Sequence, residues 1–345
     1  MNFGNLLDKN KKITIHDWYI PTKIFGALLG LFLFIFFYPN PGDGSQVIFE
    51  IPRGSNFKQV SRVLYEEGII PNEFNFKLAA FLYGSENKLK AGRFTIPSGL
   101  NYFELIDFLL KGGFDEQVLV TIPEGIWQHD LAGLLKAKLN IDSSAFMKLS
   151  ENKYFLAELG INSKSIEGYL LPNTYYFYKN SKSEEVLRKL ANEMDKVFDA
   201  KVEARLKELK MTKHEILTLA SIIEAESNIP SEYKRISAVY HNRLKKWMPL
   251  EADPTIQYLK RNGKHNRVLF KDLEIDSPYN TYKNYGLPPT PINNPGIEAI
   301  YAALYPEKND YLFFVADGTG AHKFSKSYKE HLRNVEAYRK WRQSQ

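Results

Sequence analysis

The most restrictive feature of this chain is an apolar run over residues 24–38 that contains no charged residue. As a helix the run would cover about 22 Å, and adding Trp18, Tyr19 and Ile20 lengthens it to about 31 Å, enough for the hydrocarbon core of a bilayer. Its residues are apolar on all sides, whereas a core helix is amphipathic. No small-residue cleavage site follows, as it would after a secretory signal peptide. The sequence therefore predicts one transmembrane helix over residues 21–40.

Basic residues flank this run on one side. No Lys or Arg follows it before Arg53, whereas four lysines precede it: Lys9, Lys11, Lys12 and Lys23. Because positively charged flanks stay on the cytoplasmic side, residues 1–20 are predicted to form a cytoplasmic tail. Everything after about residue 40 would then lie outside the cytoplasmic (inner) membrane of a single-pass protein, with membrane lipid as one partner.

The composition is that of a folded protein with more than one domain. The chain has 345 residues, of which 44% are hydrophobic and 25% are charged, so two or three domains are expected. A net charge of +6 favours anionic partners, but no run of five basic residues and no zinc-finger spacing occurs, so we expect no nucleic-acid partner. The absence of cysteine excludes disulfides and thiolate chemistry. No second His or Cys lies at metal-ligand spacing from His322, so neither a metal nor a cofactor is expected.

Three stretches of the chain repeat one pattern of a β-like run, a turn and an amphipathic helix. The turns are Ile51-Pro52-Arg53-Gly54, Ile96-Pro97-Ser98-Gly99 and Ile122-Pro123-Glu124-Gly125. Proline lacks an N–H and glycine accepts positive φ, so each turn ends its strand. The first two units are predicted to form a small βα module over residues 45–115, and the third opens the next domain. The repeats leave open whether the module binds carbohydrate or serves as a spacer.

Residues 116–345 are predicted to form a mixed α+β domain, which makes the whole chain α+β. Residues 141–212 are mostly helical in pattern, with a strand and turn at residues 167–177. The segment 285–289 contains Gly and two Pro residues, so it forms a stiff loop that is suited to a groove wall. Asn294 followed by Pro295 predicts the start of a helix with Asn294 as its N-cap.

The helix that begins at Thr212 is the best candidate for carrying chemistry. Thr212 and Glu215 form a capping-box pattern, and the helix runs to about Ser227. Its apolar stripe consists of Ile216, Leu219, Ala220 and Ile223. Glu226 falls at one margin of this stripe, and Glu224 falls at the opposite margin. Apolar neighbours raise the pKa of a carboxyl group, which keeps it protonated near neutrality as a general acid must be. The alternative is an ordinary solvated glutamate.

The stretch LASIIEAES, which contains Glu226, resembles the catalytic helix of the endolytic murein transglycosylases, the MltG or YceG-like family. The pair Glu226-Ser227 also resembles the Glu-Ser signature of other lytic transglycosylases. Further motifs follow in the family's order: Asn242-Arg243-Leu244, Ala252-Asp253-Pro254-Thr255, Ser277-Pro278-Tyr279-Asn280-Thr281-Tyr282, Gly286-Leu287-Pro288-Pro289, Asn294-Pro295-Gly296 and Phe314-Val315-Ala316-Asp317-Gly318, then His322 and Phe324. The sequence departs from the family at Pro291, an extra proline that alters the loop spacing.

The resemblance covers nearly the whole chain and implies its layout, activity and site. The layout is a membrane anchor, a LysM-like module over residues 45–115 and a YceG-like catalytic domain over residues 116–345. The activity is that of a lyase that cuts the β-1,4 bond between N-acetylmuramic acid and N-acetylglucosamine in nascent glycan strands, with Glu226 as general acid/base. Together with residue chemistry, the resemblance gives a substrate-binding set of Glu224, Ser227, Asn242, Asp253, Tyr279, Asn280, Tyr282 and His322. The implied partners are peptidoglycan glycan strands and enzymes of cell-wall synthesis.

Two other functions stay open from the residues alone. A glycan hydrolase needs a second carboxylate across the bond, which Asp253 or Asp317 would supply, because Glu224 and Glu226 point in different directions on one helix. Hydrolysis leaves reducing ends, whereas the lyase reaction leaves 1,6-anhydro ends. A membrane-tethered, non-catalytic peptidoglycan-binding scaffold is the third reading. Asn280 has its own alternative, which is to organise the turn that contains it.

Overall fold

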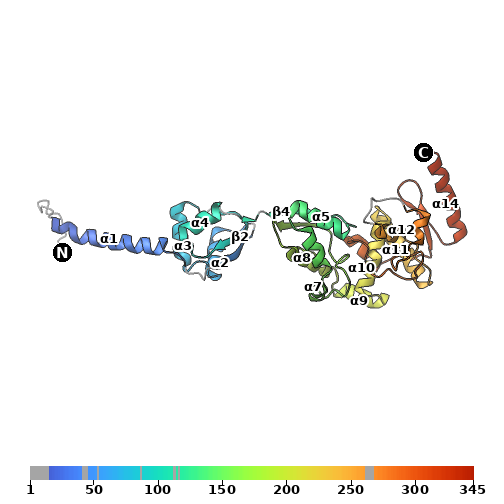
Figure 1. Cartoon of the computed structure of the whole chain (residues 1–345), viewed down its shortest axis with the longest axis horizontal. Coiled ribbons are helices and arrows are strands. Elements are labelled where there is room, and N and C mark those ends of the chain that lie inside the picture. The colour runs from blue at the N-terminus through green and yellow to red at the C-terminus, as the bar shows by residue number, and fades with distance from the viewer. Residues whose placement is uncertain are drawn as a thin grey trace, which may run out of the picture. The chain divides into compact units, whose positions relative to one another are not determined.

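The structure is a computed structural model that divides into two compact units, Met1–Gln117 and Val118–Gln345 (Figure 1). The residues whose placement it describes are 15–40, 46–52, 54–85, 88–111, 114–115, 117–260 and 268–345. Most of the predicted cytoplasmic tail, including Lys9, Lys11 and Lys12, lies outside these residues, as does Arg53. The predicted α+β class is confirmed, because helices predominate and the strands form small sheets.

The first unit is a small α+β module preceded by a long helix. Its elements are α1 (Ile15–Phe37), β1 (Gln46–Ile51), α2 (Phe57–Glu66), α3 (Glu73–Tyr83), β2 (Gly92–Pro97), α4 (Tyr102–Lys111) and β3 (Phe114–Asp115). The three strands pair in the order β1-β2-β3, antiparallel, with Phe49 opposite Phe94. Both phenylalanines are buried in one core with Phe76 of α3 and Leu64 of α2. The module therefore has a hydrophobic core of its own.

The end of α1 packs into this core. Phe36 is buried, and its ring centroid lies 6.1 Å from that of Tyr102 in α4. Earlier in the helix, Ile24, Phe25 and Leu28 are exposed. Among the residues that the structure describes, no helix is both long enough and apolar enough to cross a membrane.

The three predicted strand–turn–helix repeats are confirmed. β1 leads to α2, β2 leads to α4, and β4 (Gln117–Thr121) leads to α5 (Gln128–Leu139). The glycine of each turn has a left-handed backbone, with φ of +83° at Gly54, +83° at Gly99 and +71° at Gly125. Glycine reaches this region without the steric cost that a Cβ would add, which is why the pattern recurs with Gly in the last position. The first repeat gains a second helix, α3, that the pattern did not predict.

The second unit is mostly helical and contains the predicted helix that begins after Thr212. It continues from β4 and α5 with α6 (Ser143–Ser150), α7 (Lys153–Glu158), β5 (Thr174–Tyr178), α8 (Ser183–Val197), α9 (Ala200–Leu209), α10 (Lys213–Glu226), α11 (Pro230–Lys245), α12 (Asp253–Leu259), the 3-10 helix η1 (Phe270–Glu274), α13 (Ile297–Leu304), β6 (Phe313–Ala316), β7 (His322–Ser325) and α14 (Tyr328–Gln343). Its strands form two-stranded sheets, β4-β5 and β6-β7. The predicted strand at 167–177 corresponds to β5.

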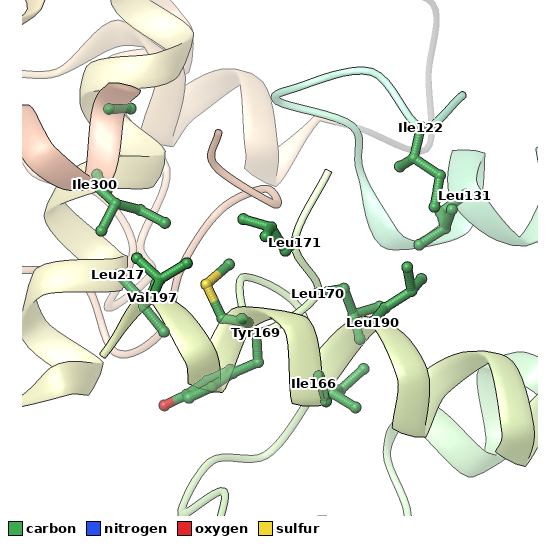
Figure 2. Close-up of a cluster of buried hydrophobic side chains, with 14 of the residues drawn as sticks. Ile122, Leu131, Ile166, Tyr169, Leu170, Leu171, Leu190, Val197, Leu217 and Ile300 are labelled. Carbon is green, nitrogen blue, oxygen red and sulfur yellow. The ribbon is translucent and has the colours of Figure 1, made fainter. Parts of the chain in front are cut away.

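One hydrophobic core joins the helices of this unit. Figure 2 shows Leu190 of α8 close to Leu170, and Val197 of α8 close to Leu217 of α10 and Ile300 of α13. All of these side chains are buried. The aromatic residues Tyr175 and Phe177 also fill this core, whereas Tyr176 is exposed.

α10 is more deeply enclosed than its sequence pattern predicts. The predicted capping box is confirmed: Thr212 is the N-cap, and its side chain accepts a hydrogen bond from the Glu215 backbone N–H. The apolar stripe was expected to cover one face, but every residue from Ile216 to Ile223 is buried. The reason is that α11, α12 and α13 all pack against α10. Thr218 and Ser221 tolerate this burial because their hydroxyls donate to the backbone carbonyls of His214 and Thr218.

The prediction that Asn294 caps a helix is wrong. The N-cap of α13 is Gly296. The Asn294 side chain instead links segments that are distant in sequence: its oxygen accepts from Gly168 N–H at 2.9 Å, and its amide donates to the Ile126 carbonyl at 3.1 Å. Its backbone carbonyl accepts from Gly125 N–H. Because its side chain makes these tertiary bonds and is fully buried, it is not available to cap α13.

Candidate active site

Glu226 is the last residue of α10, and it projects from a helix whose body is buried. Its side chain is partly exposed, and its oxygen Oε1 accepts a hydrogen bond from the hydroxyl of Tyr240 in α11. Tyr240 is itself only 1% exposed, so this donor is fixed by packing. Among the described residues, no hydrogen bond to the second oxygen of Glu226 is found. That oxygen is therefore the one able to carry a proton toward a ligand.

The surroundings of Glu226 raise the pKa of its carboxyl to about 7. Burial is the main cause; the Tyr240 hydrogen bond lowers the pKa, the negative charge of Asp253 raises it, and the charge of Arg243 lowers it. At a pKa of about 7 roughly half of the molecules carry the acid at neutral pH. A group that is poised in this way can both donate and accept a proton in one reaction cycle.

Asp253 and Tyr282 form a second polar pair beside Glu226. Asp253 is the first residue of α12, and its oxygen Oδ1 accepts a 2.6 Å hydrogen bond from the Tyr282 hydroxyl. Burial raises the pKa of Tyr282, and the hydrogen bond and charge of Asp253 raise it again, so the phenol stays protonated. The charge of Glu226 also acts on Tyr282. These two predicted site residues are therefore brought together with Glu226.

Glu224 lies only two residues before Glu226, but its carboxylate is used within the protein. Its oxygens accept hydrogen bonds from the Gly296 N–H and from the Tyr233 hydroxyl, both at 2.9 Å. Gly296 is the N-cap of α13, where a carboxylate also interacts favourably with the helix dipole. A Cβ added at Gly296 would lie 2.0 Å from Glu124 Oε1, so the two glutamates crowd this helix start. The position of Glu224 indicates that it joins α10 to α13.

Ser227 and His322 meet at the side chain of Glu232. Glu232 Oε2 accepts from His322 Nδ1 at 2.7 Å, and its Oε1 accepts from the His322 backbone N–H at 2.9 Å. The Ser227 hydroxyl donates to Glu232 Oε2 at 3.4 Å. The ring of His322 packs edge-on against Phe314 at 5.3 Å, and Phe314 packs edge-on against Tyr240 at 6.0 Å. A continuous set of contacts therefore joins the β6-β7 hairpin to Tyr240, which donates a hydrogen bond to Glu226.

The other predicted site residues form hydrogen bonds with backbone groups or with neighbouring side chains. Asn242 donates to the carbonyls of Asn309 and Tyr311, both at 3.0 Å. Asn280 is fully buried, and its amide donates to the Leu273 and Ile275 carbonyls while its oxygen accepts from the Tyr282 N–H. The Tyr279 hydroxyl is 2.7 Å from that of Thr290. For Asn280 this geometry favours the alternative role of organising its own turn, in which it positions Tyr282.

Sequence reasoning missed three residues of this site, namely Tyr233, Tyr240 and Glu232. Tyr233 and Tyr240 are seven residues apart and so lie on one face of α11, from which each donates to a glutamate of α10. This seven-residue spacing was the available signal. Glu232 gave no signal, because its partner His322 is 90 residues away in the chain. Among the described residues, no group of three or more His, Asp or Glu side chains could hold a metal ion.

Comparison with known proteins identifies the family of the chain. The model of the YceG-like family matches residues 49–337 of the chain. The chain is 34% identical over 303 residues to the endolytic murein transglycosylase of Bacillus subtilis (strain 168), covering 84% of this chain and 83% of that protein. It is 31% identical over 315 residues to the endolytic murein transglycosylase of Streptococcus pneumoniae (D39), covering 83% of this chain and 57% of that longer protein.

A solved structure is similar to this chain in fold. The crystal structure of a yceG-like protein from Listeria monocytogenes superposes with a TM-score of 0.58 and 33% identity, covering 84% of this chain and 98% of that chain. The resemblance predicted from the motifs around Glu226 is thereby confirmed. The chain belongs to the YceG-like family.

Proposed function

We propose that this chain is a lytic transglycosylase that cuts peptidoglycan glycan strands within the strand, with Glu226 as its general acid/base. The observation that carries the proposal is the Glu226 carboxyl, which has a pKa raised to about 7 by burial and one oxygen fixed by Tyr240. The B. subtilis and S. pneumoniae relatives are endolytic murein transglycosylases, which supports the same substrate class.

The reaction needs a single carboxyl group acting twice. Protonated Glu226 donates its proton to the glycosidic oxygen, so the bond from that oxygen to C1 of N-acetylmuramic acid breaks. The resulting carboxylate then takes the proton from the C6 hydroxyl of the same sugar, whose oxygen attacks C1 and closes a 1,6-anhydro ring. No water is consumed, and Glu226 regains its proton. The negative charge of Asp253 and the phenol of Tyr282 lie close enough to Glu226 to stabilise positive charge at C1.

A hydrolase would require a carboxylate that activates water. The geometry of Asp317 does not favour this role, because its Oδ1 accepts from both the backbone N–H and the hydroxyl of Thr319 and closes its own turn. Asp253 is engaged by Tyr282 but interacts electrostatically with Glu226. Product chemistry separates these activities, because a hydrolase leaves reducing ends and a lytic transglycosylase leaves anhydro ends.

The test is mass analysis of the products formed from uncross-linked glycan strands. Wild-type protein is expected to release fragments with 1,6-anhydro ends, and Glu226→Gln is expected to lose at least about a hundredfold in rate, the usual contribution of a general acid. Glu203→Gln, at an exposed position of α9, is the matched control for the chemical change. Full anhydro-product release by Glu226→Gln would overturn the role of Glu226. Reducing ends would favour a hydrolase, and intact strands with wild-type protein would favour a binding scaffold.

The N-terminal segment is proposed to anchor the chain in the cytoplasmic membrane, with the second unit outside the cytoplasm. The apolar run at residues 24–38, its lysine-rich upstream flank and the exposure of Ile24, Phe25 and Leu28 in α1 support this. The first unit is proposed to be LysM-like and to hold or space the second unit near glycan, and enzymes of wall synthesis are proposed as partners. Alkaline extraction of isolated membranes tests the anchor. Protease digestion of intact spheroplasts tests its direction in the membrane. Release of the chain by alkali would contradict the anchor.

A further inference from the structure

A groove that Glu226 does not line lies on the second unit. It has a volume of about 950 Å³ and lies between the end of α9, the first half of α10, the second half of α11 and the loop at residues 286–289. Thr218 of α10 and Asn242 of α11 are among its lining residues, with Trp247 at the end of α11. The loop at residues 286–289 forms one wall, as its two prolines and glycine predict.

Two exposed aromatic rings lie side by side at this groove. Trp247 is 72% exposed and Tyr285 is 56% exposed, and their planes are nearly parallel, with an angle of 6° and centroids 5.9 Å apart. A β-bridge joins Tyr285 to Pro249, two residues after Trp247, so the two segments that carry the rings are hydrogen-bonded to each other. Unlike a singly exposed apolar side chain, two adjacent exposed rings form a contiguous apolar surface that a ligand can cover.

The backbone at Trp247 is held in a conformation that favours glycine. α11 ends in a Schellman motif, in which Trp247 N–H donates to the Leu244 carbonyl and Met248 N–H donates to the Arg243 carbonyl. Trp247 occupies the position of this motif where glycine is usual, and its φ is +52°. A tryptophan there is strained and also exposed, so the fold gains nothing from it that glycine would not supply better. An outlier of this kind points to a functional role for the ring.

A histidine of α10 holds the loop wall of the groove in place. His214 Nε2 is 2.8 Å from the Pro289 carbonyl, and its Nδ1 is 2.6 Å from the Tyr169 hydroxyl. A carbonyl can only accept, so Nε2 donates to Pro289, while Nδ1 pairs with the Tyr169 hydroxyl. Both ring nitrogens are therefore used to hold the loop wall. Polar groups still face the groove, because Lys210 and Lys245 line it and make no ion pair within the described part of the chain.

We propose that Trp247 and Tyr285 form a sugar-stacking platform, an outlying subsite that binds a pyranose ring of the glycan strand away from the cleaved bond. Ring faces carry partial negative charge and attract the C–H hydrogens on the apolar face of a pyranose. The lysines complement the carboxylates of the strand's peptide stems. Tyr285 follows Tyr282 by three residues, so their Cα atoms are at most about 11 Å apart, which places the platform near the Asp253–Tyr282 pair. The substrate class rests on the proposed function.

The test uses the full-length Glu226→Gln protein in detergent, so that binding is measured without cleavage. The probe is a β-1,4-linked pentamer of N-acetylglucosamine, followed by purified glycan strands, with affinity measured by tryptophan fluorescence and calorimetry. Trp247→Gly is expected to weaken binding about tenfold or more while leaving the melting temperature unchanged or higher, because glycine suits the left-handed position. Trp247→Phe is expected to restore most of the affinity. Trp341→Phe is the matched control, since Trp341 stacks on Tyr338 elsewhere on the unit.

The outcomes separate this proposal from the proposed function. Equal affinity with Trp247→Gly, or no binding of either probe by the parent protein, would overturn the platform. Cleavage by the protein with Glu226 intact is measured on the same strands. If wild-type protein fails to cut but Trp247→Gly still loses binding, the platform stands and the proposed function fails. If wild-type protein cuts and Trp247→Gly binds as tightly as its parent, the proposed function stands and the platform fails.

Discussion

Replacing Glu226 by glutamine should make the stability of the second unit depend differently on pH. Folding raises the pKa of Glu226 from 4.5 to about 7, mainly through burial. The folded state therefore binds this proton more tightly than the unfolded state. Its stabilising contribution is fully present below about pH 4.5 and is lost as the pH rises through about 7. Glutamine has nearly the same shape, carries no charge at any pH and can still accept the hydrogen bond from Tyr240.

The size of the effect follows from the pKa change. One pKa unit corresponds to about 1.4 kcal/mol, so a rise of this size makes the ionised carboxyl destabilising by about 3 kcal/mol at pH 8 relative to pH 4. At pH 4 the acid is neutral in both states, and wild-type protein and Glu226→Gln should differ little. At pH 8 the variant should be more stable by about 3 kcal/mol, which in a unit of this size is a melting temperature roughly 6–12 °C higher.

The assay is thermal and urea unfolding of both proteins at half-unit steps from pH 4 to pH 8.5. The quantity compared is the difference in unfolding free energy between them, because titrating groups that do not interact with Glu226 cancel in that difference. Glu203→Gln supplies the correction for the substitution itself. A difference that stays constant across this range would refute the reasoning, since it would mean that Glu226 ionises in the folded protein as it does in the unfolded chain.

Three further substitutions test the packing around the site. Tyr240→Phe removes the hydrogen bond that lowers the pKa of Glu226, so the alkaline limb of the kcat/KM profile should move to higher pH and kcat should fall roughly tenfold. Gly168→Ala should cost at least about 2 kcal/mol of unfolding free energy in urea, because its φ is +87° and the added Cβ would lie 2.2 Å from Pro291 Cβ. Thr212→Ala should cost about 1 kcal/mol, measured by thermal melting, with cutting at low temperature unchanged.

Local sequence signals predicted the elements well because local interactions determine them. The capping box at Thr212 and the Pro-x-Gly turns specify where helices and strands begin or end, and the structure has them in place. The burial of α10 on all sides could not be predicted, because it depends on three helices that come later in the chain. A helix with Thr218 and Ser221 inside appears amphipathic in sequence, yet their hydroxyls are satisfied by the helix backbone.

The sequence did not predict which residues far apart in the chain contact one another at the site. Asn294 fits the pattern of an N-cap before proline, but bonds to Gly168 and Ile126 use its side chain instead. Its two partners lie 126 and 168 residues away, a separation that no periodicity argument reaches. Glu226 could be selected because a family motif contains it. For its donor Tyr240 the sequence offered only the seven-residue spacing from Tyr233, and a tyrosine on an amphipathic helix is ordinarily a core residue.

The contrast between Glu224 and Glu226 explains how one helix end can carry both a structural and a chemical carboxyl. Burial raises the pKa of both groups, and each accepts a hydrogen bond from a tyrosine of α11. The two glutamates differ in the hydrogen bonding of their second carboxyl oxygen. That of Glu224 accepts the Gly296 N–H at the start of α13, which favours the ionised form and leaves no oxygen for a ligand. That of Glu226 has no such donor in the described part of the chain, so its proton can pass to a bound sugar without breaking a bond that holds the fold.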